Sequence, residues 1–271
     1  MTRILLVLFA GMAMAAVSGF QAEIAEWRTQ REARLKADGG WLTVAGLFWL
    51  HEGVNRFGKT EGNDIVLPDG PAQAGSFELH AGKVTLTLDG RTHSVEPESP
   101  DPAKVGRLDL FLIKRGDRYG IRLKDPDSEY RRHYHGIEYF PANESYRVTA
   151  RWVAEPRHIP ILNILGQTED SESPGYAVFR LDGKEMRLTP ILEEPGAKEL
   201  FYIFRDLTTG KETYPAGRFF YSDLPSSGRV VLDFNKAYNP PCAFTPYATC
   251  PLPPKENHLP ARIEAGEKTY H

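Results

Sequence analysis

The segment Asp233–Glu267 constrains the fold of this chain more than any other, because it is too rich in proline to be regular. It holds seven of the chain's prolines and both of its cysteines. Proline fixes φ and has no backbone N–H, so such a segment is excluded from helix interiors and from the centre of a sheet. We therefore expect an ordered, extended wrap that lies against the rest of the protein.

The two cysteines, Cys242 and Cys250, are separated by seven residues within this wrap. An even number of cysteines in an exported chain favours a disulfide. The alternatives are a metal site that includes His258 and a reactive thiol, but the spacing differs from the roughly two to four residues typical of zinc pairs. We expect the disulfide, and we expect neither a metal site nor a cofactor.

The N-terminus predicts export. Arg3 precedes the apolar run Ile4–Val17, and the small residues Val17–Gly19 suit cleavage. Residues 1–19 are therefore predicted to be a secretory signal peptide, because the apolar run is shorter than the roughly 20 residues that a membrane span needs. An uncleaved anchor is the alternative. We expect a periplasmic or secreted protein with no stable membrane span after cleavage.

Composition excludes several kinds of partner. The net charge is −3 and the charged residues, 25% of the chain, are mixed in sign. Such a chain has no basic surface for nucleic acid and no polybasic patch for anionic lipid. Its 271 residues suffice for a sizeable core in one large or two small domains. The sequence does not specify the oligomeric state.

Hydrophobic periodicity predicts one helix followed by many short strands. Residues 20–40 are expected to contain the N-terminal helix, because apolar residues recur at helical spacing before Gly39. From residue 63 the period changes to two, with turn signals about every eight to twelve residues, which favours a mainly β fold, an antiparallel sandwich or barrel. Residues 41–271 are expected to form one β-rich domain, with a sub-division near 96–103. The predicted strands are Asp64–Pro68, Ser76–His80, Lys83–Leu88, Leu108–Lys114, Tyr119–Lys124, Tyr146–Val153, Ile159–Leu165, Tyr176–Leu181, Glu185–Ile191, Leu200–Arg205, Arg218–Tyr221 and Arg229–Phe234.

Short catalytic motifs are missing from the sequence. Gly53–Thr60 matches the phosphate-loop string, but a strand is predicted directly after it, so no helix N-terminus can face a phosphate. We interpret it as a glycine-rich turn. The strings Gly-x-Ser-x-Gly, His-Glu-x-x-His, Cys-x-x-Cys and Gly-x-Gly-x-x-Gly do not occur. Common hydrolase, metalloprotease, redox and dinucleotide signatures are therefore absent.

Polar residues gather at the predicted strand ends and in the wrap. Because Asp and Arg are seldom fully buried unless paired, Arg218 is predicted to pair with Asp206 or Asp233 under the wrap. We expect these side chains, above all, to hold a coil that has no backbone ladder of its own. The alternative is a ligand-binding or catalytic site. The candidate residues are Asp206, Thr208, Thr209, Arg218, Asp233, Asn235, Asn239 and Asn257.

Several long strings resemble those of a known family, the domain of unknown function 1684 family. The resemblance runs from about Trp27 to the C-terminus. That family is bacterial and archaeal and carries no assigned activity, so the resemblance implies neither a catalytic residue nor a cofactor. The strings are Trp41–Leu50, Arg115–Arg118, Asp233–Cys242, Cys250–Pro254, Asn257 and Ala265–Glu267.

Three functions are compatible with these features. We favour an exported β-rich protein that binds a small polar or anionic ligand at strand ends under the wrap, with Arg218 as the anchor for an anion. The first alternative is a hydrolase-like enzyme that uses Asp206 or Asp233 as its general base. The second is a structural or partner-binding envelope protein, which would expose a large apolar patch.

Overall fold

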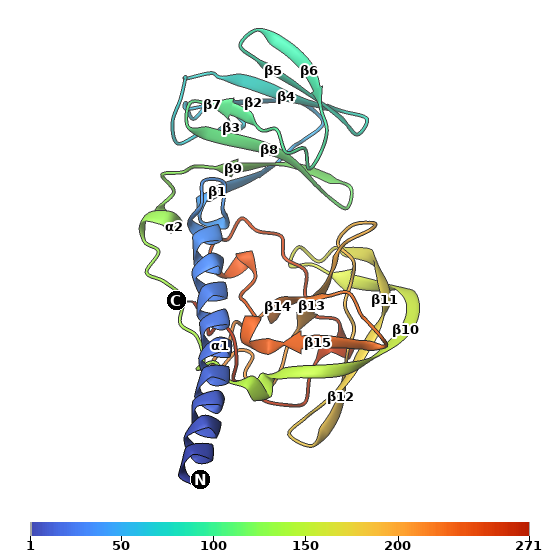
Figure 1. Ribbon diagram of the computed structural model, residues 1–271. Coiled ribbons are helices and arrows are strands. Elements are labelled where there is room, and N and C mark those ends of the chain that lie inside the picture. The colour runs from blue at the N-terminus through green and yellow to red at the C-terminus, as the bar shows by residue number, and fades with distance from the viewer. Residues whose placement is uncertain (1, 271) are drawn as a thin grey trace. The chain divides into compact units, whose positions relative to one another are not determined.

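Helix α1 (Thr2–Lys36) opens the structure, a computed structural model that describes residues 2–270, with side chains from residue 19 on (Figure 1). It ends in a turn in which Gly40 N donates to Ala37 O at 2.8 Å. It starts earlier than the expected residue 20, because the leucine, alanine and methionine residues of the predicted leader are good helix formers. Within the described residues, no helix combines the length and apolar character that crossing a membrane requires.

The chain forms two compact units. The first contains residues up to 34, 136–243 and the residues from 250 on, and the second contains 35–135 and 244–249. In sequence, the second unit is therefore an insertion into the first, and residues 244–249, which lie between the two cysteines, also belong to it. The sub-division expected near 96–103 falls inside the second unit.

The first unit is built on two antiparallel sheets. Its larger sheet has the strand order β12-β11-β10-β15, and β13 pairs with β14 in the smaller one (Figure 1). In the larger sheet, residues directly opposite each other include Arg147 on β10 and Asp233 on β15. The strands are β10 (Arg147–Leu162), β11 (Thr168–Leu181), β12 (Lys184–Leu188), β13 (Glu199–Phe204), β14 (Arg218–Asp223) and β15 (Arg229–Asp233).

Strand β10 is one long strand where the sequence predicts two. It pairs with β11 over almost its whole length, with a register shift between Ala154 and Arg157. Gly175 faces this bulge with a φ of +151°, and a Cβ there would lie 2.2 Å from Val153 O. Pro160 is tolerated because β15 pairs only with residues 147–151 of β10, so no strand pairs with Pro160 on that side.

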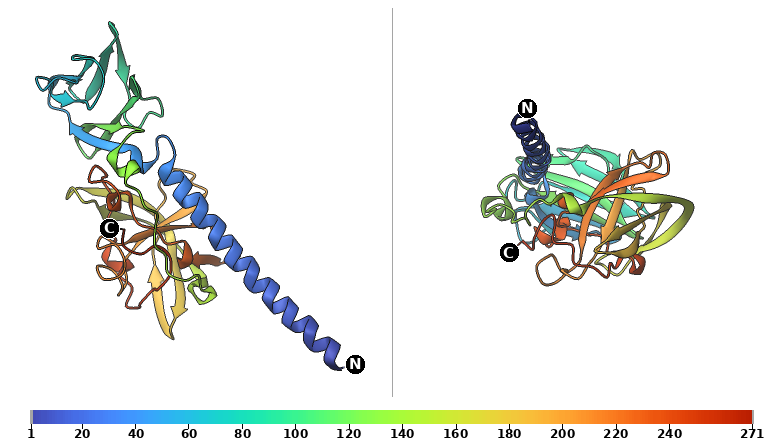
Figure 2. Two further views of the ribbon diagram at one scale, coloured as in Figure 1. Left: turned by 90° about the vertical axis from the view of Figure 1, so that its left-hand side faces the viewer. Right: turned by 60° about the horizontal axis from the view of Figure 1, so that its bottom comes forward.

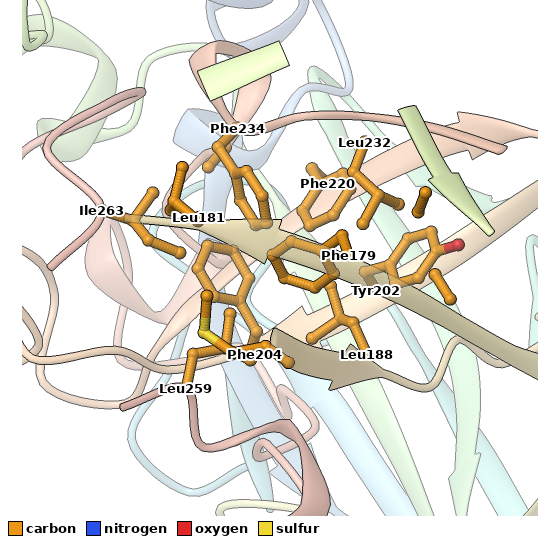
Figure 3. Packing of buried hydrophobic residues seen from close by; sticks show 14 of the residues in the cluster. Phe179, Leu181, Leu188, Tyr202, Phe204, Phe220, Leu232, Phe234, Leu259 and Ile263 are labelled. Carbon is orange, nitrogen blue, oxygen red and sulfur yellow. The ribbon is translucent and has the colours of Figure 1, made fainter. Parts of the chain in front are cut away.

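The core of the first unit is aromatic, and the wrap contributes to it (Figure 3). Phe234 lies 5.5 Å from Phe204 and 5.2 Å from Phe220 between ring centroids. Leu259 and Ile263 of the wrap pack into the same cluster, and burial alternates residue by residue from 257 to 265. The wrap therefore behaves there as an extended segment with one buried face.

The second unit also consists of two sheets. One has the order β1-β9-β8-β7 and is antiparallel, and the other has the order β3-β2-β4-β5-β6, in which only the β2–β3 pair is parallel. Both sheets contribute to one core, in which Phe57 and Phe77 lie 5.1 Å apart. The strands are β1 (Val44–Trp49), β2 (Gly53–Gly58), β3 (Ile65–Val66), β4 (Gly75–His80), β5 (Lys83–Leu88), β6 (Arg91–Val95), β7 (Ala103–Val105), β8 (Leu108–Arg115) and β9 (Arg118–Lys124).

These sheets confirm the prediction of a mainly β, antiparallel fold with one N-terminal helix. No sheet closes into a barrel within the described residues, so a sandwich-like arrangement is the one of the two alternatives that fits. The predicted strands Leu108–Lys114 and Tyr119–Lys124 are present as β8 and β9, which pair as an antiparallel hairpin. A short helix and several 3-10 turns complete the chain: α2 (Glu129–Arg132), η1 (Trp41–Thr43), η2 (Glu144–Tyr146), η3 (Phe234–Lys236), η4 (Pro241–Ala243) and η5 (Lys255–Asn257).

The prediction of an ordered wrap is confirmed as well. After η3 the chain forms only short turns and isolated bridges, such as Arg205 with His258 and Phe219 with Tyr238. In the first unit this segment, orange to red in Figure 2, lies alongside α1, which agrees with a hydrogen bond between Arg31 and Glu267. Gly266 is required where the wrap passes Ala237, because a Cβ there would lie 2.3 Å from Ala237 O.

Candidate functional site

Arg218 on β14 holds the end of the wrap. Its side chain is 1% exposed. Nη1 donates to the carbonyls of Ala265 and Glu267, and Nη2 donates to Ile263 O at 3.0 Å and to Asp206 Oδ2 at 3.4 Å. Burial lowers the pKa of the Arg218 guanidinium, and the charge of Asp206 opposes that change. The predicted pair of Arg218 with Asp206 is thus present, and most of its donors bind backbone oxygens.

Both carboxylate oxygens of Asp206 are likewise occupied by hydrogen bonds within the protein. Oδ1 accepts from Thr208 N at 3.2 Å, from Thr208 Oγ1 at 2.7 Å and from Thr209 Oγ1 at 3.2 Å. Oδ2 accepts from Ile263 N at 2.7 Å as well as from Arg218. Its carboxylate is completely buried. Asp206 therefore closes its own turn and fixes the wrap, with no oxygen facing solvent.

Glu267 joins the wrap to α1. Its Oε1 accepts from Arg31 Nε at 2.8 Å, and its Oε2 accepts from Asn239 N at 2.7 Å. Arg31 also donates to Asn239 O at 3.0 Å and lies over the ring of Tyr238, 4.6 Å from its centroid. Burial raises the pKa of Glu267, and the charge of Arg31 opposes the rise. Asn239 is thus held through its backbone, and its own amide donates to Lys268 O at 2.7 Å.

Asp233 and Asn235 form a separate cluster at the end of β15. Asp233 Oδ1 accepts from Asn235 N and Nδ2, at 3.1 and 2.9 Å. Asp233 Oδ2 accepts from Arg147 Nε at 2.8 Å. Asn235 also makes two 2.9 Å hydrogen bonds to the backbone N and O of Asn143. This cluster fixes the segment that leads into β10.

The side-chain amide of Asn257 makes hydrogen bonds to the backbone that a neighbouring strand would otherwise make. Its Oδ1 accepts from Thr189 N at 2.9 Å, and its Nδ2 donates to Thr189 O and Ile203 O, both at 2.8 Å. An amide side chain supplies here the donor and acceptor that a neighbouring strand would supply.

The eight candidate residues are therefore not one cluster. Asp206, Thr208, Thr209 and Arg218 form one network, which Glu267 O connects to the Arg31–Asn239 group. The Asp233–Asn235 cluster and Asn257 each stand apart, with partners of their own. In every group the polar atoms mostly bind backbone, as expected of side chains that hold a coil.

The predicted disulfide between Cys242 and Cys250 is confirmed, with Cα atoms 6.3 Å apart. Tyr214 OH donates to Cys242 O at 3.0 Å, so the bridge is attached to the loop before β14. Within the described residues, no group of three or more His, Cys, Asp or Glu side chains could hold a metal ion.

A pocket opens beside the Asp233–Asn235 cluster. Its volume is about 450 Å³ and it is open to solvent. Gln21 Nε2 donates to Ala142 O at 3.0 Å across its wall, and the Arg147 guanidinium lies 4.7 Å from the ring centroid of Phe20. The pocket is lined by Phe20, Gln21, Phe140, Pro141, Ala142, Asn143, Glu144, Tyr146 and Glu264.

Comparison with known proteins identifies the family. The family described as "Protein of unknown function (DUF1684)" matches residues 132–268. The chain belongs to this family. A solution NMR structure of an uncharacterized protein from Haloarcula marismortui is 33% identical, covers 51% of this chain and 79% of its own, and has a TM-score of 0.43. No match is found among curated proteins.

The DUF1684 segment contains every strand of the first unit and all eight candidate residues, which confirms the family noted in the sequence. The match does not extend to the strings Trp41–Leu50 and Arg115–Arg118. It excludes Arg31 and most of the second unit. Sequence reasoning missed Arg31 and Arg147 as partners, because an arginine on a helix or strand is ordinarily exposed. It also missed the pocket, although the aromatic residues Tyr139, Phe140 and Tyr146 around Pro141 were a usable signal.

Proposed function

We propose that this chain is an exported binding protein for a small polar ligand that carries hydrogen-bond donors and one apolar face. The observation that carries the proposal is the open 450 Å³ pocket of the first unit. It is lined by Phe20 and Gln21 of α1, by residues of the segment 140–146 that leads into β10, and by Glu264 of the wrap.

The lining suggests the chemistry of the ligand. The rings of Phe20, Phe140 and Tyr146 offer apolar contact, and the carboxylate of Glu144 can accept hydrogen bonds. Glu264 Oε1 already accepts from Arg262 Nε and Nη2, at 3.0 and 2.8 Å. The carboxylate of Glu144 disfavours an anion. Arg218 is also unsuited to anchor one, because its donors are used within the protein. Amines and polyols fit this lining better than acids do.

Two of the candidate residues support this pocket as positioning residues. Asn235 fixes the backbone of Asn143, which lines the pocket. Asp233 orients both Asn235 and the Arg147 guanidinium that lies over Phe20. The remaining candidates support the proposal only indirectly, because they hold the wrap that contains Glu264. They are Asp206, Thr208, Thr209, Arg218, Asn239 and Asn257.

The contacts of the two aspartates favour binding over hydrolysis. A general base needs an oxygen within reach of a substrate proton. Asp206 uses both oxygens on buried donors, and Asp233 uses both on Asn235 and Arg147. Neither carboxylate lines the pocket.

Export is part of the proposal. A disulfide is typical of oxidising compartments. Cleavage after residue 19 would leave Phe20 and Gln21, which line the pocket, in the mature chain. Intact-mass measurement of the protein purified from its natural host should give a chain without residues 1–19. Recovery of a chain that still carries Met1 would contradict cleavage.

A thermal-shift screen tests the pocket. We would add primary amines, quaternary ammonium compounds and monosaccharides to the purified protein and follow the unfolding temperature, with native mass spectrometry to confirm binding. A compound that raises the unfolding temperature of the wild type should not raise that of Tyr146→Ala, and should raise that of Glu264→Gln by less. Glu194→Gln, an exposed residue of the same unit that does not line the pocket, is the matched control. A hit that both variants retain in full would place the ligand elsewhere and contradict the proposal.

A further inference from the structure

One buried arginine of the second unit has an edge of its guanidinium without a partner. Arg122 on β9 is 8% exposed and lies on the face of the sheet opposite to Ile121 and Leu123, which belong to the core. Its Nε and Nη2 are both buried, and neither has a hydrogen-bond partner among the described residues. Buried charges in proteins are normally paired, so this edge lacks an anion.

The two free donors have the geometry of a binding fork. The N–H bonds of Nε and Nη2 run parallel along one edge of a guanidinium, at the spacing of two oxygens on one carbon or phosphorus. In Arg107, which lies in the same unit, the corresponding Nε–Nη2 edge binds a carboxylate. Its Nε and Nη2 donate to Oδ1 and Oδ2 of Asp125 at 2.8 and 3.1 Å.

The surroundings of Arg122 are positive and apolar. Its guanidinium lies 5.0 Å from the ring centroid of Trp41, and Leu47 and Phe111 are its neighbours on the adjacent strands. Burial, and then the charge of Arg115, lower the pKa of Arg122 to about 10.

The nearby groups leave Arg122 without a counter-ion. Burial and then Arg122 lower the pKa of Lys124, whose ammonium donates to Gly39 O at 2.6 Å. The carboxylate of Glu98, which has the opposite charge, is engaged by Arg115 at 2.6 Å.

We propose that the Nε–Nη2 edge of Arg122 is a binding site for the carboxylate of a small organic acid. The carboxylate accepts both N–H groups, and the apolar part of the acid contacts Trp41, Leu47 or Phe111. These neighbours favour an organic acid over inorganic phosphate, which offers the same pair of oxygens but no apolar surface. The site belongs to the second unit and is separate from the pocket of the first.

Three anions test the site and its preference. The unfolding temperature of the full chain is measured with increasing benzoate, acetate or inorganic phosphate, with sodium chloride keeping the ionic strength constant. We expect a saturable rise, largest for benzoate. No saturable rise with any of the three would overturn the proposal, and a rise with phosphate alone would overturn the choice of an organic acid.

Variants of the arginine locate the effect. Arg122→Gln should lose the benzoate response, and Arg122→Lys, which keeps the charge without the fork, should bind benzoate about tenfold more weakly or worse. The matched control is Arg118→Gln, on the same strand and the same face but exposed and lying over Trp49. It should respond as the wild type does. An unchanged response in Arg122→Gln would overturn the proposal.

A measurement on the unmodified protein covers the case in which the variants fold poorly. Each arginine gives a separate Nε–Hε signal in a proton–nitrogen NMR spectrum, and hydrogen bonding to a carboxylate shifts it. Benzoate should move one such signal, with the same midpoint as the thermal response, and assignment by backbone-linked experiments should place it at Arg122. Movement of a different arginine signal, or of none, would overturn the proposal.

Discussion

Arg218 in the first unit and Arg122 in the second are both strand arginines that fold into the interior, yet their surroundings differ. Arg218 meets three backbone carbonyls and a carboxylate, whereas Arg122 meets an indole ring and leaves a fork of donors unused. The first arrangement is complete within the chain. The second is completed only by something that the chain does not supply. Burial alone therefore does not mark a binding site, and the proposal for Arg122 rests on a buried fork of donors that has no partner among the described residues.

The difference has a local cause. The wrap is proline-rich and has no ladder, so its carbonyls are available to Arg218. In contrast, β9 lies between β1 and β8, whose carbonyls are occupied by strand pairing. The second unit can pair an arginine with a carboxylate, as Arg107 and Asp125 show. The unpaired edge of Arg122 is thus a property of its position and not of the unit.

The largest effect should come from Arg218→Met. The change leaves the Asp206 carboxylate buried without its counter-ion and removes the donors that hold the carbonyls of residues 263–267. Breaking such a buried pair costs about 3–5 kcal/mol of the free energy of unfolding. Urea unfolding would measure it, with the exposed Arg229→Met as control. A loss below about 1 kcal/mol would show that the two arginines do not differ in the way described.

Removing the disulfide shows how much of the stability of the wrap comes from the covalent bridge and how much from its hydrogen bonds and ion pair. In the double variant Cys242→Ser, Cys250→Ser we expect the free energy of unfolding to fall by about 2.5 kcal/mol, from the entropy of the loop that the bridge closes. Urea unfolding of the wild type with and without reductant should give the same difference. If the loss exceeds that of Arg218→Met, sulfur and not Arg218 is the main attachment of the wrap.

Arg122→Met should act in the opposite direction. Without added acids, it removes an unpaired buried charge and keeps an apolar chain beside Trp41, so the free energy of unfolding should rise by about 1 kcal/mol. In saturating benzoate that advantage should shrink, because only the wild type gains a ligand. Equal destabilisation of Arg122→Met and Arg218→Met would contradict the comparison.

The smallest effect on stability should come from removing the carboxylate of Asp125, which binds the Nε–Nη2 edge of Arg107. Burial would raise the pKa of Asp125, but the hydrogen bonds from Arg107 and Asp127 N, together with the charges of Arg107 and Arg132, outweigh it and hold that pKa below its usual 3.8. The pair therefore contributes stability above pH 3.8, and this contribution is lost as the pH falls through the lowered value. Thermal unfolding of the wild type and of Asp125→Asn should differ by less than about 1 kcal/mol at neutral pH and converge in acid. A difference that grows in acid would contradict the sign.

The sequence was sufficient for what depends on local pattern. Alternating hydrophobicity predicted strands β5, β8 and β9, proline content predicted the wrap, and the even number of cysteines predicted the Cys242–Cys250 bridge. It was not sufficient where the local structure depends on residues that are distant in the chain but close in space. Strand β10 contains Pro160, which is acceptable only because β15 does not pair with the strand at that point.

The same limit applied to the sites. Arg218 was recognisable because it lies among apolar residues and has an aspartate nearby in sequence. Arg122 alternates with Ile121 and Leu123, which is the usual pattern of a strand with one wet face. Its burial depends on a tertiary neighbour, Trp41, that no periodicity reveals. The pocket likewise needs α1 beside residues 140–146, a contact between segments far apart in the chain.

The bond between Arg31 and Glu267 joins residues 236 positions apart. During synthesis, α1 emerges long before the carboxylate with which its arginine pairs, and the whole second unit is made in between. The contact that fastens α1 to the end of the wrap therefore forms only after nearly the whole chain has been made.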